Sequence, residues 1–314
     1  MITGFAAVVE RALEAAVRAP SPHNTQPWRF AVDGARVDVL LDRSRVLPVA
    51  DPDGRQARMA CGAAALNLTV SLRAAGLAVA VRAPGLHGAL ASVRITGRSE
   101  PDERDLARCI ARRHTNRRPF LDREVPRPVR TRLADAAADE GAVLHLVADW
   151  GRYDRIAALV READHVQATD ERFRAETRRW TGRPPGAADG VPATAAGPPP
   201  SLQPALALRA YAGQDRLPAR DFEQQPLLGV LLTRTDGPVQ QVRAGFALQR
   251  VLLTATLLGL GVSFLSQPLE VPATHTRLRG LFDDGEPQTV LRIGYGFPVP
   301  HAGRRPPDEV LSHE

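Results

Sequence analysis

Two long segments rich in alanine and leucine constrain the fold of this chain most strongly, because they match in length and in the positions of their glycines. Residues 61–77 read CGAAALNLTVSLRAAGL, and residues 244–260 read AGFALQRVLLTATLLGL. Gly62 aligns with Gly245, both segments end in Gly-Leu, and each precedes a short apolar stretch typical of a strand. The match indicates two core helices of a duplicated architecture. The alternative is two unrelated core helices with ordinary glycine stops.

The remaining segments alternate between helical and extended patterns, which predicts a mixed α+β protein. Apolar residues recur at helical spacing in residues 5–17, and a hairpin is expected around the turn Asp33-Gly34. Further helices are expected at 56–75, 102–113, 127–140 and 154–164, and strands at 28–32, 36–41, 77–81, 91–96, 142–147, 227–233 and 290–295. Because the helix and strand pattern restarts near residue 106, we expect a first half over 1–105 and a second over 106–314.

A proline-rich stretch interrupts the second half at about 181–226. Proline removes a backbone donor and blocks helix continuation, so most of this stretch must be loop. A loop of this length is either a disordered linker or a cover over a functional site. We interpret it as a lid inserted into the second half.

Charge and cysteine content exclude several classes of function. The formal net charge is +6, and all 41 basic residues are arginine, interleaved with Asp and Glu rather than gathered in one stripe. This pattern disfavours nucleic-acid binding. Cys61 and Cys109 form no CxxC pair and the histidines show no metal-ligand spacing, so neither a disulfide scaffold nor a metal site is expected. No secretory leader is evident and no apolar run reaches about 18 residues, so we expect a cytoplasmic protein without a membrane span.

Common catalytic motifs are also missing. The chain has no GxSxG elbow, no GxxxxGK[ST] loop, no HExxH pair, and no GxGxxG between a strand and a helix. Hydrolase, P-loop and Rossmann interpretations are therefore disfavoured.

Two polar segments suit an anionic cofactor with a hydrogen-bonding ring. Residues 112–118 crowd arginines, a histidine and a threonine ahead of a helix, where they could hold a phosphate. A solvated run of charge is the alternative. Residues 21–27, SPHNTQP, offer short donors and acceptors that could read the edge of a heterocycle. Their alternative is a helix C-terminal turn in which Asn24 and Thr25 cap the backbone.

Both segments resemble signatures of the FMN-dependent nitroreductase family. PSPHNTQPWRF, at 20–30, is similar to the PSxxNxQPWxF segment of that family, and RHTNRRPF, at 113–120, to its Arg-x-Ser-x-Arg/Lys phosphate-binding signature. QPLE, at 267–270, looks like the Pro-Ile-Glu loop that passes the flavin ring, and Arg304-Arg305 like the C-terminal basic pair. With its long central insertion, the chain is especially similar to the Acg-like subfamily of actinobacteria.

The resemblance implies a nitroreductase-like α+β fold in which two fused halves mimic the homodimer of the family and hold FMN non-covalently. In this interpretation Arg113, Thr115 and Arg117 bind the phosphate, while Asn24 hydrogen-bonds the ring or the ribityl chain. The full set of residues implied to bind the cofactor is Ser21, His23, Asn24, Gln26, Arg113, Thr115, Arg117, Gln267, Pro268, Leu269, Glu270, Arg304 and Arg305.

The order of the signatures departs from the ordinary family pattern. The phosphate signature usually precedes the NxQPW segment, whereas here it follows by about ninety residues and occurs once. The first half also lacks a QPLE counterpart, and the second half lacks an NTQPW counterpart. We therefore expect one FMN per chain. Whether Asn24 contacts the same flavin as Arg113 is open.

The expected function is hydride or electron transfer through the flavin N5 to or from a small organic molecule, with a donor such as NAD(P)H. Because the cofactor supplies the chemistry, no side chain is assigned a catalytic role. The rival is a protein that sequesters FMN under a lid without turnover. A third alternative is a dedicated oxidase or dehydrogenase acting on a biosynthetic intermediate. As a pseudo-dimer, the chain would be a monomer or form a homodimer.

Overall fold

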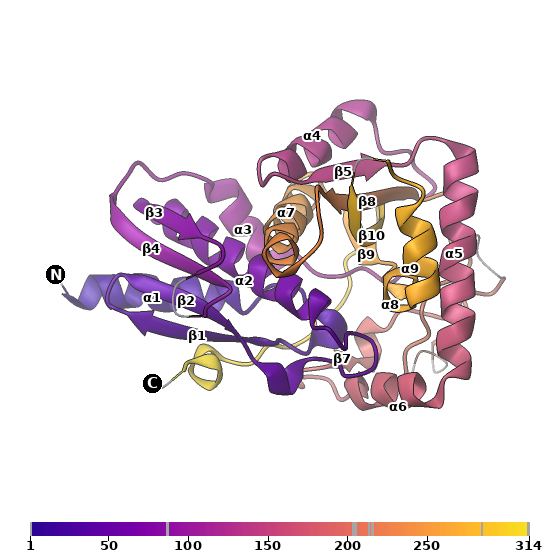
Figure 1. Ribbon diagram of the computed structural model, residues 1–314, viewed down its shortest axis with the longest axis horizontal. Helices are drawn as coiled ribbons and strands as arrows, with labels where there is room; N and C mark the ends of the chain where they lie inside the picture. Colours follow the sequence, from indigo (N-terminus) through magenta and orange to yellow (C-terminus); the bar gives the residue numbers. More distant parts are fainter. Residues whose placement is uncertain are drawn as a thin grey trace.

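The computed structural model describes residues 2–85, 88–202, 206–212, 214, 217–283 and 285–312. In this part of the chain, two antiparallel four-stranded sheets lie on opposite sides of a pair of long helices, α2 (Arg55–Ala74) and α7 (Pro238–Leu257) (Figure 1). Helices and strands are mixed along the chain. The α+β fold class that the sequence predicts is confirmed.

The first sheet has the strand order β1-β2-β4-β3 and packs against α2, which also contacts α1 and α3. Trp28 pairs with Leu41 across the expected hairpin. Phe30 and Val39 are fully buried and belong to the core cluster that α1 and α2 share with this sheet. The bounds are α1 (Ile2–Ala16), β1 (Trp28–Asp33), β2 (Arg36–Leu41), β3 (Leu77–Arg82), β4 (Ala91–Arg98) and α3 (Arg104–Arg112).

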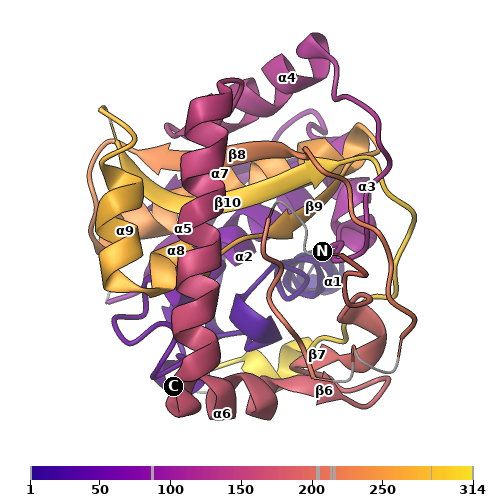
Figure 2. The ribbon, with the colours of Figure 1, turned by 90° about the vertical axis from the view of Figure 1, so that its right-hand side faces the viewer.

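The second sheet has the order β5-β8-β10-β9 and is covered on both faces. Leu231 and Ile293 face the cluster formed with α4 and α7, whereas Val230 and Val290 face the cluster formed with α5 and α9. Figure 2 shows α5 crossing the outer face of these strands. The bounds are α4 (Arg127–Ala138), β5 (Val143–Leu146), α5 (Trp150–Thr169), α6 (Glu171–Trp180), β8 (Leu227–Thr233), β9 (Gly261–Phe264), α8 (Gln267–Glu270), α9 (Pro272–Arg279) and β10 (Glu286–Gly294).

The two central helices, α2 and α7, pack backbone against backbone where the sequence aligns Gly62 with Gly245. A Cβ added at Gly62 would lie 2.0 Å from the carbonyl oxygen of Val242, and one added at Gly245 would lie 2.0 Å from that of Met59. No side chain fits at either position. Farther along, the buried amide of Gln249 donates to Asn67 Oδ1 at 2.7 Å.

The end of the chain returns from the second sheet to the first. Leu311 forms an isolated bridge with Phe30, and Ser312 N donates to the Phe30 carbonyl at 2.8 Å. Residues 300–305 therefore run across the junction between the two halves (Figure 1). This path brings Arg304 next to the loop that follows α1.

The structure adds helices that the sequence pattern does not predict. α6 buries only Phe173 and Glu176, so it has little apolar periodicity to recognise, and Asp170 marks its start by accepting from Arg172 N at 2.8 Å. The QPLE segment is a loop in the sequence-based interpretation, but it forms the short helix α8. Proline at the second position of α8 is compatible with a first helical turn.

The stretch 181–226 is mostly irregular, as the prolines predict, but part of it is packed. Its regular elements in the described residues are the short strands β6 (Thr181–Arg183) and β7 (Val191–Pro192) and one 3₁₀ turn. Val191, Ala195 and Ala196 are buried. Part of the sequence-predicted lid, residues 203–205, 213, 215 and 216, lies outside the described residues. The start of this stretch is therefore packed against the rest of the protein.

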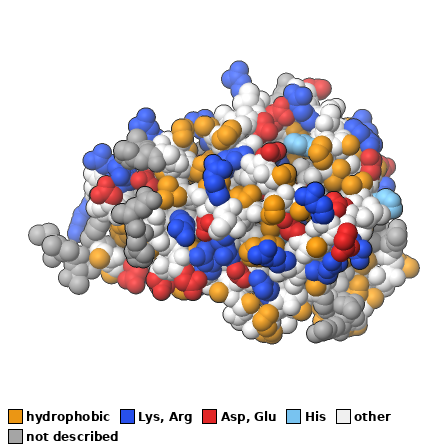
Figure 3. Space-filling model, turned by 60° about the horizontal axis from the view of Figure 1, so that its bottom comes forward, with side chains coloured by type: hydrophobic (Ala, Val, Ile, Leu, Met, Phe, Trp, Pro, Cys, Tyr) orange, Lys and Arg blue, Asp and Glu red, His pale blue; other side chains and the backbone are white. Residues whose placement is uncertain are grey.

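The described residues also bear on the expectations about surface charge, membrane spans, metal sites and cysteines. On the face in Figure 3, basic and acidic side chains are interspersed. None of the described helices is both long and apolar enough to cross a bilayer. Within the described ranges, no three His, Cys, Asp or Glu side chains gather as a candidate metal site. Cys61 and Cys109 are both buried free thiols.

Candidate functional site

The loop between α1 and β1 has a strained backbone. His23, Asn24 and Gln26 have φ values of 45°, 58° and 53°, although only glycine adopts this region freely. Non-glycine residues persist in this region only where their surroundings hold them, and they concentrate at functional sites. Residues 21–26 are therefore a candidate for function on backbone geometry alone.

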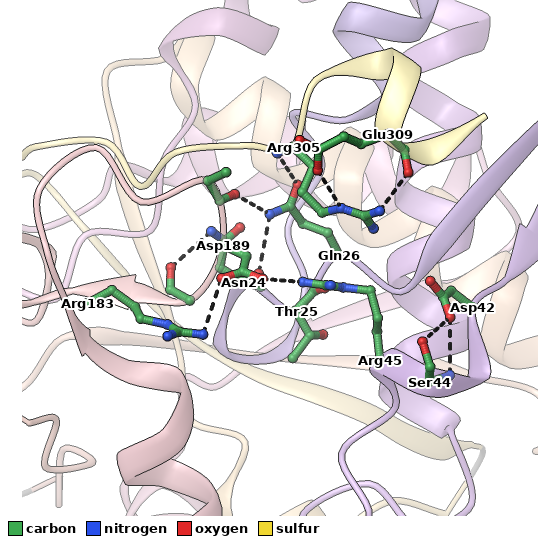
Figure 4. A network of polar contacts seen from close by, with 12 residues as sticks. Asn24, Thr25, Gln26, Asp42, Ser44, Arg45, Arg183, Asp189, Arg305 and Glu309 are labelled. Carbon is green, nitrogen blue, oxygen red and sulfur yellow. Dashed lines mark hydrogen bonds and ion pairs between the residues drawn. The ribbon is translucent and has the colours of Figure 1, made fainter.

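Polar contacts from distant segments hold this loop in place (Figure 4). The Asn24 amide donates to the carbonyls of Gly190 and Gly303, both at 3.0 Å. Gln26 Nε2 donates to Ala188 O at 2.7 Å, and Gln26 Oε1 accepts from Arg305 N at 2.9 Å. The loop thus ties together the start of the proline-rich stretch and the C-terminal segment.

Charged side chains also hold this loop against the start of the proline-rich stretch. Arg45 donates to the Thr25 carbonyl and pairs with Asp189 at 2.5 Å. Asp189 also pairs with Arg183 at 3.3 Å. These contacts fix residues 183–190 against the loop (Figure 4).

Next to this loop lies a pocket rich in arginine, which we call the arginine pocket. It encloses about 470 Å³ of space free of protein atoms, including its mouth. Its lining joins the α1–β1 loop, the segment 113–117, the wall at 191–195 and the C-terminal segment 300–304. The described residues that line it include no Asp or Glu. Its polar lining includes Ser21, Asn24, Arg113, Thr115, Arg117 and Arg304.

Arg113 and Arg304 in the arginine pocket have no anionic partner among the described residues, although both donate to backbone carbonyls. Arg113 is 5% exposed, and neither Arg113 nor Arg304 forms an ion pair with any described residue. Burial, together with the charge of Arg117, lowers the pKa of Arg113 to about 10. Burial, together with the charges of Arg113, Arg18 and Arg117, lowers the pKa of Arg304 to about 9. An anion in this pocket would relieve both the repulsion and the lost hydration.

A larger pocket, which we call the central pocket, lies beside the arginine pocket. It encloses about 790 Å³ with its mouth and shares Ser21, Thr115 and Arg117 with the arginine pocket. Its apolar walls come from α2, α7, β9 and α8, and its polar groups include Gln56 and Gln288. This size and this mixture of surfaces are typical of small-molecule sites.

Comparisons with known proteins identify the family. The "Putative NAD(P)H nitroreductase Rv3131" of Mycobacterium tuberculosis is 36% identical over 98% of this chain and 91% of its own length. The chain belongs to the nitroreductase family. The "Putative NAD(P)H nitroreductase acg" of the same organism is 30% identical over 97% of this chain and 95% of its own length. No family model matches the chain.

The solved structures that match the chain are less similar to it in sequence. A nitroreductase with bound FMN from Desulfitobacterium hafniense is 16% identical, with a TM-score of 0.39, and the match covers 67% of this chain and 98% of that one. An oxidised iodotyrosine deiodinase bound to FMN and 3-iodo-L-tyrosine is 15% identical, with a TM-score of 0.41, and covers 64% and 95%.

The structure of this nitroreductase-family protein brings most of the sequence-predicted site residues together. Asn24 and Arg113, which are far apart in the sequence, line the same arginine pocket, as does Arg304. Ser21, Thr115 and Arg117 line both pockets, while His23, Leu269 and Glu270 line the central pocket. Their contact with a cofactor stays a prediction.

Four of the predicted residues line neither pocket. Gln26 is fully buried in the backbone contacts described above, and Arg305 pairs with Glu309 at 3.4 Å. Because QPLE forms a helix, Gln267 turns toward Asp164 and Ala207, and the Pro268 carbonyl accepts from the Thr274 hydroxyl at 3.0 Å. In the described structure these four residues make contacts within the protein, and their part in cofactor binding stays a prediction.

Sequence reasoning missed several residues that line the central pocket. Arg55, at the start of α2, is buried and donates to the carbonyl of Pro287 at 2.6 Å. Arg209 and Tyr211, within the proline-rich stretch, line the mouth of the same pocket. An arginine that opens an alanine-rich core helix was a usable signal for Arg55. Nothing local distinguishes Arg209 from the many other arginines of the chain.

Proposed function

We propose that this nitroreductase-family protein binds one FMN and serves as an oxidoreductase that passes hydride or electrons between the flavin N5 and a small organic molecule. The observation that carries the proposal is that the arginine pocket and the central pocket adjoin and share Ser21, Thr115 and Arg117 in their linings. FMN has a doubly charged phosphate at one end and a flat apolar ring with polar edges at the other. The arginine pocket matches the charged end of FMN, and the adjoining central pocket, with its apolar walls and polar groups, matches the ring end.

The arginine pocket fits the phosphate end of FMN. Arg113, Arg117 and Arg304 would supply charge-assisted hydrogen bonds, and Ser21 and Thr115 would supply hydroxyls. Asn24 Oδ1 is buried without a hydrogen-bond partner among the described residues. A ribityl hydroxyl is a donor that could satisfy such an acceptor.

The central pocket fits the ring end. Met59, Leu248 and Phe264 offer apolar surface to the ring faces, and Gln56 and Gln288 are among the polar residues of the lining. When bound, the flavin supplies the hydride chemistry. The protein orients the ring and shields it from water. Burial, reinforced by Arg209 and Arg117, holds the pKa of His23 well below its usual range, so His23 would stay neutral in the pocket.

We infer further that residues 1–105 and 106–314 are fused counterparts of the two subunits of a family homodimer. The glycine match and the close packing of α2 on α7 support this inference. Because Asn24 comes from the first half and Arg113 from the second, both halves would hold the same FMN. One complete site per chain follows.

The reductant can be tested directly. We expect NADH or NADPH to bleach the yellow, FMN-loaded protein when oxygen is absent, because a hydride donor reaching the ring would reduce it. The measurement is the visible absorbance of flavin under anaerobic conditions, with dithionite as the reference for complete reduction. If neither nucleotide bleaches a sample that dithionite bleaches, ordinary nitroreductase activity is excluded.

That second outcome would favour sequestration of FMN, the alternative function. The observation in its favour is the position of Arg209 and Tyr211, which come from the proline-rich stretch and line the central pocket. Side chains at this place would stand between the ring and a nicotinamide. Slow or absent bleaching by nucleotides, with FMN firmly bound, is the expected behaviour of such a protein.

A further inference from the structure

Glu270 is a buried carboxylate that joins three separate parts of the chain. Its side chain is 3% exposed. Its Oε1 accepts from Gln56 of α2 at 3.1 Å, and its Oε2 accepts from Gln167 of α5 at 2.8 Å. The same Oε2 pairs with Arg209, which belongs to the described segment 206–212 of the proline-rich stretch. Glu270 thus holds this segment against the rest of the second half.

Two residues of the segment 206–212, Arg209 and Tyr211, line the central pocket, whereas Leu206 packs in the core of the second sheet. Tyr211 lies with its ring 4.8 Å from the guanidinium carbon of Arg117 and meets the His23 ring edge-on at 6.1 Å. Arg209 Nη1 lies 3.4 Å from His23 Nε2. These contacts hold Arg209 and Tyr211 against His23 and Arg117, which line the same pocket.

Moving this segment would separate two buried charges. Arg209 is 11% exposed, so both partners of the ion pair are shielded from water. Separating a buried pair leaves an uncompensated charge in a medium of low polarity, which is strongly unfavourable. The pair therefore resists any opening of the pocket at Arg209 and Tyr211.

We propose that Glu270 is a positioning residue that latches the segment 206–212 over the central pocket, so that access to a bound ring depends on the size of the reagent. This proposal rests on the proposed FMN site. Dithionite, a small anion, reaches the ring past the closed segment. A dinucleotide such as NADPH reaches it only as fast as the latch opens.

The test compares the two reductants on a latch-free variant. Arg209→Met with Glu270→Gln removes both charges but keeps an acceptor for Gln56 and Gln167. Glu162→Gln is the matched control, because Glu162 pairs with Arg277 at 2.6 Å on the exposed side of α5. In anaerobic stopped-flow measurements, we expect NADPH to reduce the double variant about tenfold faster than wild type, with dithionite changing less than about threefold.

Hydrogen exchange supplies a readout that needs no bound flavin. In the flavin-free double variant, amides of residues 206–212 should exchange about tenfold faster than in wild type, while those of α2 and α7 stay unchanged. The Glu162→Gln control should match wild type throughout. Equal acceleration across the whole chain would mean general destabilisation and would overturn the latch.

Two further outcomes separate the latch from the flavin site. If the double variant does not fold, Tyr211→Ala leaves the ion pair intact and should still raise the ratio of the NADPH rate to the dithionite rate. An unchanged ratio in the folded variants overturns the proposal. If wild-type protein binds no FMN, the proposed function fails, and the exchange measurement alone decides whether Glu270 holds the segment.

Discussion

Arg113→Ala is expected to weaken FMN binding roughly 10- to 150-fold, because it removes a charged hydrogen bond worth about 1.5 to 3 kcal/mol. Arg113 is buried beside the other cations of the arginine pocket, so water would solvate its guanidinium poorly in place of a phosphate. The measurement is the Kd for FMN, obtained by titrating flavin-free protein and following flavin fluorescence.

Arg172→Ala is the matched control for this substitution. Arg172 lies exposed on α6 and lines neither pocket, and its replacement removes the same charge. Its Kd for FMN should equal that of wild type. If the two variants bind FMN equally well, the phosphate does not lie in the arginine pocket.

Gly62→Ala is expected to lower the free energy of unfolding by about 3 kcal/mol or more, the upper range of overpacking effects. The new methyl would lie 2.0 Å from the Val242 carbonyl, which is a backbone atom that cannot rotate away. Alanine favours helices over glycine by roughly 1 kcal/mol, but this gain is smaller than the clash. Helices α2 and α7 would have to separate.

Gly97→Ala controls for the loss of glycine itself. Gly97 lies exposed in β4, and a Cβ added there meets nothing within 4 Å. Its effect on chemical denaturation should stay within about 0.5 kcal/mol. If Gly62→Ala is equally mild, the two helices are not packed backbone to backbone as described.

Periodic segments with clear stops were predictable from the sequence. The glycine-matched segments become α2 and α7, and the apolar run 227–233 becomes β8 with the same bounds. Hydrophobic periodicity is a local property, so it identifies such elements without knowledge of their partners. The helix α6 was not predicted, because only Phe173 and Glu176 are buried and an apolar periodicity is therefore missing.

The site was predictable where a short motif brings its own chemistry. Asn24 and Arg113 were both assigned to the cofactor, but their meeting in one pocket depends on the course of the chain between them. The same holds for Arg209 and Glu270, which are 61 residues apart and pair only after folding. Side-chain direction within α8 was also beyond the sequence, so the positions of Gln267 and Pro268 outside both pockets could not be foreseen.

The central claim is that both halves build one FMN site per chain. Its most direct test is the flavin content of the purified protein after incubation with FMN and removal of the excess, measured by visible absorbance against protein concentration. The account predicts one FMN per chain, with absorption bands of oxidised flavin. A protein that retains no flavin, or that binds two per chain, would contradict it.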